Sequence, residues 1–279
     1  MGWSVGGATS EITRCARTLA TEGTVSGIRY DKSDRFCLDG QKLVAVGAVG
    51  YGGGGYGEID TQYRTENDSF AQIISVGADP TIASGPDAFV VNTKDGQVLR
   101  YEPFNGLLAT SGIGFFPQPG DWTDSTAWRR VRWLLTKQSD RSGNEIRWTY
   151  TGDAASGDYR PDKITYTYNT GVLAGSRYVQ FTYEDRPDVV VGYQAGVKHT
   201  MSKRVKSIEM YAPNPAVTSL VWRYNLSYTS SPATKRRDDH ADPAEPRGAR
   251  VDRLQHRPAG QQVGDEEQGH LDLVAAEDV

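Results

Sequence analysis

Alternation of apolar and polar residues, broken by clusters of turn residues, is the feature that most constrains the fold of this chain. The clearest case is Glu145–Thr151, in which Ile146, Trp148 and Tyr150 alternate with polar side chains. A period of two places one set of side chains on each face of a β-strand. The turn residues Asp140–Asn144 come directly before this segment, so the sequence predicts a strand that leaves a hairpin turn.

The same alternation recurs up to about Tyr228. Further predicted strands are Lys163–Gly171, Arg177–Asp185 and Ser219–Tyr228. Two other segments have short apolar runs on both sides of an Asp-Gly pair, which is a strong signal for a two-residue hairpin turn. These predicted hairpins are Arg35–Val46, with its turn at Asp39-Gly40, and Asp87–Glu102, with its turn at Lys94-Asp95-Gly96.

Helical periodicity is scarce, and its best candidate is Ser125–Gln138. Trp128, Val131 and Leu135 fall at helical spacing, but Trp133 interrupts the apolar stripe. The alternation around Val131 suits a strand equally well, and the strand interpretation is favoured. With no βαβ unit and no glycine-rich loop between a strand and a helix, the sequence predicts an all-β fold, an antiparallel and hairpin-rich sheet.

The distribution of charge argues against several classes of partner. The chain has 279 residues and a net charge of −4. Residues 233–279 carry seven of its 31 basic and eleven of its 35 acidic residues, which leaves 24 of each before Ala233. A neutral body has no basic face for nucleic acid or an anionic membrane. No apolar run is long enough for a transmembrane helix, and no signal peptide is visible.

The composition changes abruptly after residue 231. Every aromatic residue lies at or before Tyr228, whereas residues 233–279 are rich in Arg, Asp, Ala, Pro, Gly and Gln. So little apolar surface cannot offset the entropy of ordering a chain. The expected division is therefore a β-rich domain over residues 1–231 and a disordered tail over residues 232–279. The abruptness of the change also suggests a shifted reading frame, in which case the tail would carry no evolved site.

Several motifs, in a fixed order, carry a resemblance to a known family. They are GWSVGGATSEITRCART (Gly2–Thr18), DRFCLDGQKLV (Asp34–Val44), YRTENDSFAQIIS (Tyr63–Ser75) and GPDAFVVNTKDGQVLRYE (Gly85–Glu102). Together they resemble the SpvB N-terminal region and the TcaC-like B component of insecticidal toxin complexes. The segments DRSGNEIRWTYT and Glu184–Tyr211 continue the resemblance, which covers about residues 2–231.

The chain also resembles Rhs-type proteins, because Gly143-Asn144 followed by Trp148-Thr149-Tyr150 is a loose copy of a YD repeat. The resemblance implies part of a β-rich shell that encloses a toxic C-terminal polypeptide and docks on a pore-forming partner. It implies a secreted, non-enzymatic scaffold, truncated at both ends, whose partners are other regions or subunits of the same toxin. Two alternatives remain: an exported module that binds glycans or cell surfaces, and a fragment of a toxin whose missing C-terminal domain is an ADP-ribosyltransferase.

The two cysteines, Cys15 and Cys37, are candidates for a nucleophile, a metal site, a disulfide or packing. The only histidine before residue 233 is His199, so neither a catalytic pair nor a zinc site is indicated. A disulfide would close a loop of about 22 residues and contribute roughly 3 kcal/mol. Free packing thiols are favoured, because the shells of this family assemble in the reducing interior of the producing cell, and the disulfide stays open as the alternative.

The remaining polar motifs are interpreted as structural. The glycine-rich Gly50–Gly57 lacks the Lys-Ser/Thr of a phosphate-binding loop, and Asp140–Glu145 lacks the spacing of a calcium loop. The carboxylates Glu58, Asp60, Glu66 and Asp68 are expected on solvated strand faces, and Asp265-Glu266-Glu267 lacks the context of an ADP-ribosyltransferase. No catalytic, cofactor-binding or metal-binding residue is predicted. The residues predicted to have structural roles are Cys15, Cys37, Gly40, Trp148 and Tyr150.

Overall fold

The computed structural model describes residues 9–29, 33–49, 55–77, 85–103, 115–117, 128–153, 158–194, 197–213, 216–228 and 250–252. These residues are almost entirely β, with one short helix, α1 (Leu19–Glu22), which confirms the predicted all-β, antiparallel class. The strands are β1 (Glu11–Cys15), β2 (Arg35–Leu38), β3 (Gln41–Ala48), β4 (Thr61–Thr65), β5 (Gln72–Val76), β6 (Ala88–Asn92), β7 (Val98–Pro103), β8 (Phe115–Pro117), β9 (Trp128–Arg130), β10 (Arg132–Ser139), β11 (Asn144–Asp153), β12 (Asp158–Asn169), β13 (Leu173–Gln194), β14 (Val197–Pro213), β15 (Thr218–Ser227) and β16 (Arg250–Asp252).

Eight of these strands close into a barrel. The order β1-β2-β3-β4-β5-β6-β7-β10 consists of antiparallel neighbours, and β10 pairs back onto β1. Closure joins Glu11 to Leu134 and Ile12 to Trp133, so the first described strand meets one more than 100 residues further along the chain. A closed barrel leaves none of its strands with an open edge along the paired stretch.

β10 is also the branch point of the sheet. Its first residues, Arg132–Leu134, pair with β1, whereas Lys137–Ser139 pair on the same side with β11, and β7 lies along its other side. The register of β10 against β7 shifts between Leu135 and Lys137, as in a β-bulge. Such bulges bend a strand and increase its twist. The bend at this point lets one strand belong to the barrel at its start and to an open sheet at its end.

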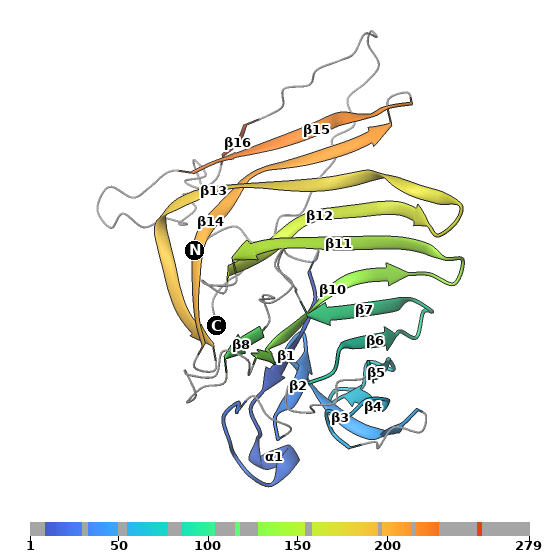
Figure 1. The fold of residues 1–279 in the computed structure, drawn as a ribbon, viewed down its shortest axis with the longest axis vertical. Coiled ribbons are helices and arrows are strands. Elements are labelled where there is room, and N and C mark those ends of the chain that lie inside the picture. The colour runs from blue at the N-terminus through green and yellow to red at the C-terminus, as the bar shows by residue number, and fades with distance from the viewer. Residues whose placement is uncertain are drawn as a thin grey trace, which may run out of the picture.

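The open sheet runs from β11 to β16 and contains the longest hairpin, β13–β14. Asp185 pairs with Lys203 and Val190 with Met201, so β13 carries more residues than β14 across this bulge. Figure 1 shows that both strands bend sharply and that the tip of the hairpin returns toward β8 and β1. The hairpin therefore brings residues near His199 back to the side of the barrel where β1 leaves β10.

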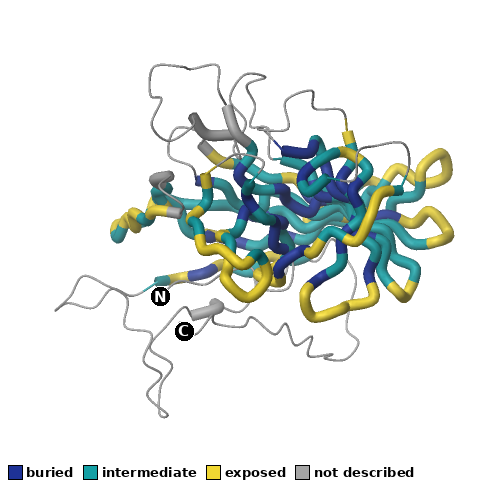
Figure 2. The backbone as a smooth tube through the Cα atoms, turned by 90° about the horizontal axis from the view of Figure 1, so that it is seen from below, coloured by how far each residue is buried: buried dark blue, intermediate teal, exposed yellow. Residues whose placement is uncertain are grey.

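An aromatic cluster fills the barrel. The ring of Phe36 stacks on Tyr56 at 5.6 Å between centroids, and it meets Phe89 and Trp133 edge-on at 5.2 and 5.3 Å. The buried core comprises Ile12, Phe36, Leu43, Tyr63, Ala71, Ile73, Phe89, Val91, Tyr101, Trp133, Leu135 and Trp148. Figure 2 shows these buried segments gathered in the body of the molecule, with the hairpin turns exposed along one side.

The predicted turns are confirmed, and their backbone angles explain the residues found there. Asp39 and Gly40 both have positive φ, 46° and 79°, as a two-residue turn of the β2–β3 hairpin requires. Gly96 has a φ of 87° in the β6–β7 turn. A Cβ at this position would collide with the guanidinium of Arg141. In the turn before β11, the carboxylate of Asp140 accepts hydrogen bonds from the backbone N–H groups of Ser142 and Asn144.

The strand interpretation of the Ser125–Gln138 segment is confirmed for β9 and β10, while residues 118–127 lie outside the described part of the chain. Within residues 232–279, only Arg250–Asp252 are described, and they pair with β15 as β16. The expected disorder of the rest of that tail stays a prediction. Among the described residues, no helix is long and apolar enough to cross a membrane.

The favoured interpretation of the two cysteines as free thiols is wrong. Cys15 and Cys37 form a disulfide, with their Cα atoms 5.9 Å apart. The reason lies in the register of β1 against β2: Cys37 is paired with Thr13, so Cys15 is its diagonal neighbour on the same face. Only the pairing of the strands, which the sequence does not reveal, brings the two sulfurs together.

Removing this bond is expected to lower the free energy of unfolding by about 3 kcal/mol, the usual value for a loop of this length. The measurement is denaturant unfolding of the protein with and without dithiothreitol, together with the double variant Cys15→Ala/Cys37→Ala. Reduction should not change the unfolding of the double variant, which makes it the control. A thiol assay that finds two free cysteines in the denatured, non-reduced protein would contradict the disulfide.

Candidate functional site

A cavity of about 520 Å³ lies beside the branch point of β10. It sits where β1 and β11 diverge from the same side of that strand, and the returning end of β14 contributes to its wall. The lining residues are Thr9, Ser10, Glu11, Thr13, Asp39, Gly40, Arg132, Leu134, Tyr150, Asp158, Tyr159, Pro161, His199, Thr200 and Met201. Residues far apart in the sequence therefore meet there because three parts of the sheet converge.

A three-membered polar cluster forms one wall of this cavity. Arg132 donates to the Glu11 carboxylate over 3.1 Å, and the hydroxyl of Tyr159 donates to the same oxygen, Oε2, over 3.0 Å. The guanidinium of Arg132 also lies over the Tyr159 ring, 4.6 Å from its centroid, and contacts its hydroxyl. Burial raises the pKa of Tyr159, so this hydroxyl stays protonated and remains a donor at neutral pH.

The β14 wall carries His199. His199 pairs with Gly192, and a Cβ at Gly192 would come within 2.3 Å of the imidazole, so only glycine leaves room for the ring. The Nδ1 atom of His199 is buried and has no hydrogen-bond partner among the described residues. Buried polar atoms without a partner are uncommon in native proteins.

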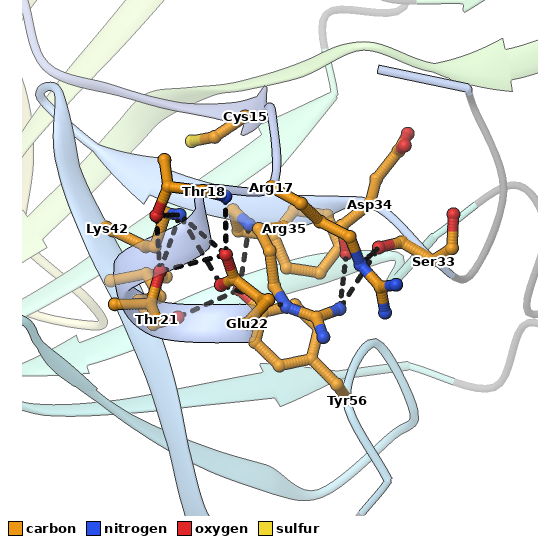
Figure 3. Close-up of polar contacts among 12 residues, drawn as sticks. Cys15, Arg17, Thr18, Thr21, Glu22, Ser33, Asp34, Arg35, Lys42 and Tyr56 are labelled. Carbon is orange, nitrogen blue, oxygen red and sulfur yellow. Dashed lines mark hydrogen bonds and ion pairs between the residues drawn. The ribbon is translucent and has the colours of Figure 1, made fainter. Parts of the chain in front are cut away.

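A second polar cluster lies around helix α1 (Figure 3). The ammonium of Lys42 donates to Glu22 over 3.0 Å and to the hydroxyls of Thr18 and Thr21 over 3.1 and 3.0 Å. Glu22 in turn accepts a hydrogen bond of 2.7 Å from the backbone N–H of Thr18. Burial by itself raises the pKa of Glu22, but the donors from Thr18, Thr21 and Lys42 outweigh it and lower the pKa to about 2.

This lowered pKa predicts a pH dependence of stability. The Glu22 carboxylate contributes its stabilisation above its usual pKa of 4.5 and loses it as the pH falls toward about 2. The free energy of unfolding should therefore fall less steeply between pH 4.5 and 2 in Glu22→Gln than in the wild type. Thr21→Val, which removes one donor to Glu22, should give an intermediate slope. Equal slopes in urea unfolding of all three proteins would contradict the assignment.

A buried ion pair lies at one end of the barrel. Arg14 and Asp34 are 3.0 Å apart, with each side chain only 1% exposed. The other carboxylate oxygen of Asp34 accepts from the backbone N–H of Arg29, and Arg14 also donates to the carbonyl of Arg130. These contacts connect β1, the residue before β2 and the last residue of β9, so the pair stabilises the fold.

The predicted structural residues fall into two groups. Gly40 and Tyr150 both line the cavity, and the hydroxyl of Tyr150 donates to the carbonyl of Leu135 over 2.7 Å. Trp148 is buried in the core, and Cys15 and Cys37 form the disulfide. Their roles in maintaining the fold stay predictions.

Most of the residues that line the cavity were not predicted from the sequence. Glu11, Arg132, Tyr159 and His199 come from β1, β10, β12 and β14, so no local motif joins them. Among the described residues, no group of three or more His, Cys, Asp or Glu side chains is arranged to hold a metal ion.

The expectation that the four acidic residues near the glycine-rich loop lie on strand faces is wrong, because all four lie in the connections before and after β4. Glu58 accepts a hydrogen bond from the backbone N–H of Gly55, and Asp60 occupies a turn with φ 58°. Asp68 accepts from the backbone N–H of Phe70, and Glu66 is exposed just beyond β4. Residues 50–54 of the loop, and Asp265-Glu266-Glu267, lie outside the described residues.

No family model and no curated protein matches this sequence. Several solved structures match its fold. The N-terminal domain of effector protein SpvB from Salmonella typhimurium is 17% identical, with a TM-score of 0.55, and the match covers 83% of this chain and 88% of that domain. The Photorhabdus luminescens Tc holotoxin pore is 17% identical, with a TM-score of 0.55 over 80% of this chain and 12% of that one.

The crystal structure of TcdB2-TccC3 is also 17% identical, with a TM-score of 0.51, and the match covers 80% of this chain. This chain spans only 13% of the TcdB2-TccC3 chain, whereas it spans most of the SpvB domain. The barrel with its attached open sheet is therefore the fold of the SpvB N-terminal domain and of one region of the large Tc toxin chains.

Proposed function

We propose that this chain is a non-enzymatic scaffold segment of a bacterial toxin complex, in which it helps to form the shell around a toxic C-terminal polypeptide. The observation that carries the proposal is the way the open sheet ends. β15 pairs with β14 along most of its length, but on its other side only Asn225–Ser227 pair with a described strand, β16. Along Thr218–Tyr224, no described strand pairs with that side of β15, so its backbone groups can pair with a further strand of a larger sheet.

The side chains beside this edge support the same conclusion. Val217 is 76% exposed and Val221 is 48% exposed, and Leu220 is exposed as well. Apolar residues gathered at an open sheet edge mark a surface that another element covers. The fold match to one region of the much longer Tc chains supports a sheet that continues into neighbouring parts of a shell.

A non-enzymatic role is supported by how the charged groups are used. Arg14 pairs with Asp34 and Lys42 with Glu22, so these buried charges neutralise one another rather than face a substrate. The proposed partners are other regions or subunits of the same toxin, and the proposed location is outside the producing cell, after export with that toxin.

A separate module that binds glycans on a cell surface is the second candidate. The match to 88% of the SpvB domain favours it, because that domain was solved as a unit of nearly the same extent. Saturable binding on a glycan array, in a chain that stays monomeric, would select this candidate over the scaffold.

The scaffold proposal is tested by co-expressing the chain with the other polypeptides of a Tc-type toxin complex and measuring sedimentation. The expected result is a stoichiometric complex in which the backbone amides of β15 exchange hydrogen more slowly than in the isolated chain. Val221→Lys should prevent the complex, because a charge at this edge opposes strand pairing. The matched control is Val172→Lys, at an exposed position in the β12–β13 turn, which should leave the complex intact. A monomeric chain whose β15 amides exchange equally fast with and without those polypeptides would refute the proposal.

A further inference from the structure

The cavity beside β10 has an acidic lining. Three carboxylates, Glu11, Asp39 and Asp158, line it with a single guanidinium, Arg132. That guanidinium is already engaged by Glu11 and by the ring and hydroxyl of Tyr159. Asp158 is paired with Arg160 at 2.7 Å, but Arg160 is not one of the lining residues. With Arg160 counted beside Arg132, the three carboxylates still leave an excess of one negative charge at the cavity, which favours a positively charged group.

Several acceptors in the lining remain unused. The hydrogen bonds of the Glu11 carboxylate within the described chain all end on Oε2, and the ion pair of Asp158 uses Oδ2. Oε1 of Glu11 and Oδ1 of Asp158 thus have no partner among the described residues. These two acceptors come from different strands, β1 and β12, so a group with several N–H donors can use both of them.

The rest of the wall is suited to an aliphatic stem. Leu134, Pro161 and Met201 line the cavity with apolar surface, and the ring of Tyr150 adds an aromatic face. Cationic side chains bury such stems along apolar surface while their charged heads reach carboxylates, and aromatic faces attract the cation further. The volume of about 520 Å³ lies within the usual range for sites that hold small ligands.

We propose that this cavity is a binding site for an alkylguanidinium or alkylammonium group, with Glu11 and Asp158 as the anionic contacts and Leu134, Pro161 and Met201 around the stem. The same chemistry is carried by an arginine or lysine side chain of a polypeptide and by a small free amine. The site is independent of the proposed scaffold function, because it lies beside β10 and not at the β15 edge.

The test is calorimetric titration of the full chain with N-acetyl-arginine amide and, as its neutral isostere, N-acetyl-citrulline amide. The arginine compound should bind about tenfold more tightly, since a hydrogen bond to a charged group contributes roughly that factor. Its affinity should fall as the salt concentration rises. Agmatine, which lacks the peptide-like groups, identifies the source: tighter binding of agmatine indicates a free amine, and tighter binding of the blocked arginine indicates a polypeptide side chain.

Variants locate the site. Glu11→Gln and Asp158→Asn should each weaken binding of the arginine compound about tenfold, while Asp185→Asn, which removes an exposed carboxylate elsewhere, should leave it unchanged. Met201→Trp fills the cavity from an exposed position without touching a charge and should abolish binding, which keeps the test valid if a charge variant fails to fold. Equal affinity for arginine and citrulline, no saturable binding, or unaltered binding by Met201→Trp would overturn the proposal.

Discussion

Replacing Trp133 by alanine is expected to lower the free energy of unfolding by about 3–5 kcal/mol. Trp133 is fully buried, and its indole N–H donates to the carbonyl of Pro86 over 2.8 Å. Its ring meets Phe36 and Phe89 edge-on, and Gly85 lies so close that a Cβ there would come within 3.0 Å of the indole. The substitution removes these contacts and leaves a cavity at the strand that closes the barrel.

The measurement is denaturant unfolding followed by far-ultraviolet circular dichroism, with Trp222→Ala as the matched control. Trp222 lies on β15 in the open sheet and is only partly buried, so the same chemical change should cost much less there. If the two variants lost equal stability, the barrel interior would not be the main core of this protein.

Breaking the buried ion pair is expected to have an effect of similar size. Asp34→Asn leaves the guanidinium of Arg14 buried without its carboxylate, and a charge stranded in this way costs about 3–5 kcal/mol. The double variant Arg14→Met/Asp34→Leu should recover most of that loss, because apolar side chains of similar volume need no compensation for desolvation. Unfolding by urea at neutral pH measures all three proteins.

The exposed pair of Asp185 and Lys203 provides the control for this prediction. The Asp185 side chain is 85% exposed, so Asp185→Asn should change stability by no more than about 1 kcal/mol. A double variant as unstable as Asp34→Asn would show that the pair contributes through specific hydrogen bonds, such as that from Arg14 to the Arg130 carbonyl, rather than through charge compensation.

The sequence predicts what is local in this fold. The turns at Asp39-Gly40 and Lys94-Asp95-Gly96 contain residues that tolerate positive φ, and the alternation around Trp148 depends on a strand with one buried face. Both are properties of short segments, so they can be recognised without knowledge of the partner strand. Because several motifs in a fixed order resemble one family, the sequence also predicted the correct fold, although identity to the solved structures is only 15–17%.

The features that the sequence does not reveal all depend on pairing between distant segments. Closure of the barrel joins Glu11 to Leu134, and the sequence of neither strand identifies the other as its pairing partner. The disulfide depends on the register of β1 against β2, and a shift of one residue would place the two cysteines on opposite faces. The cavity needs the bend in β13–β14 that returns His199 to the barrel, and neither alternation nor turn residues predict where a long hairpin bends.

The closure of the barrel by β10 also sets an order of events during synthesis. β1 and Leu134 are separated by more than 100 residues, and at about 5–20 residues per second the ribosome needs roughly 5–20 s or more to deliver the closing strand. Throughout that interval β2 to β7 can form their hairpins, but the side of β1 that faces β10 has no native partner. Chaperones that bind nascent chains would therefore have their longest opportunity at the beginning of this protein, and a translational pause before Arg132 would lengthen it.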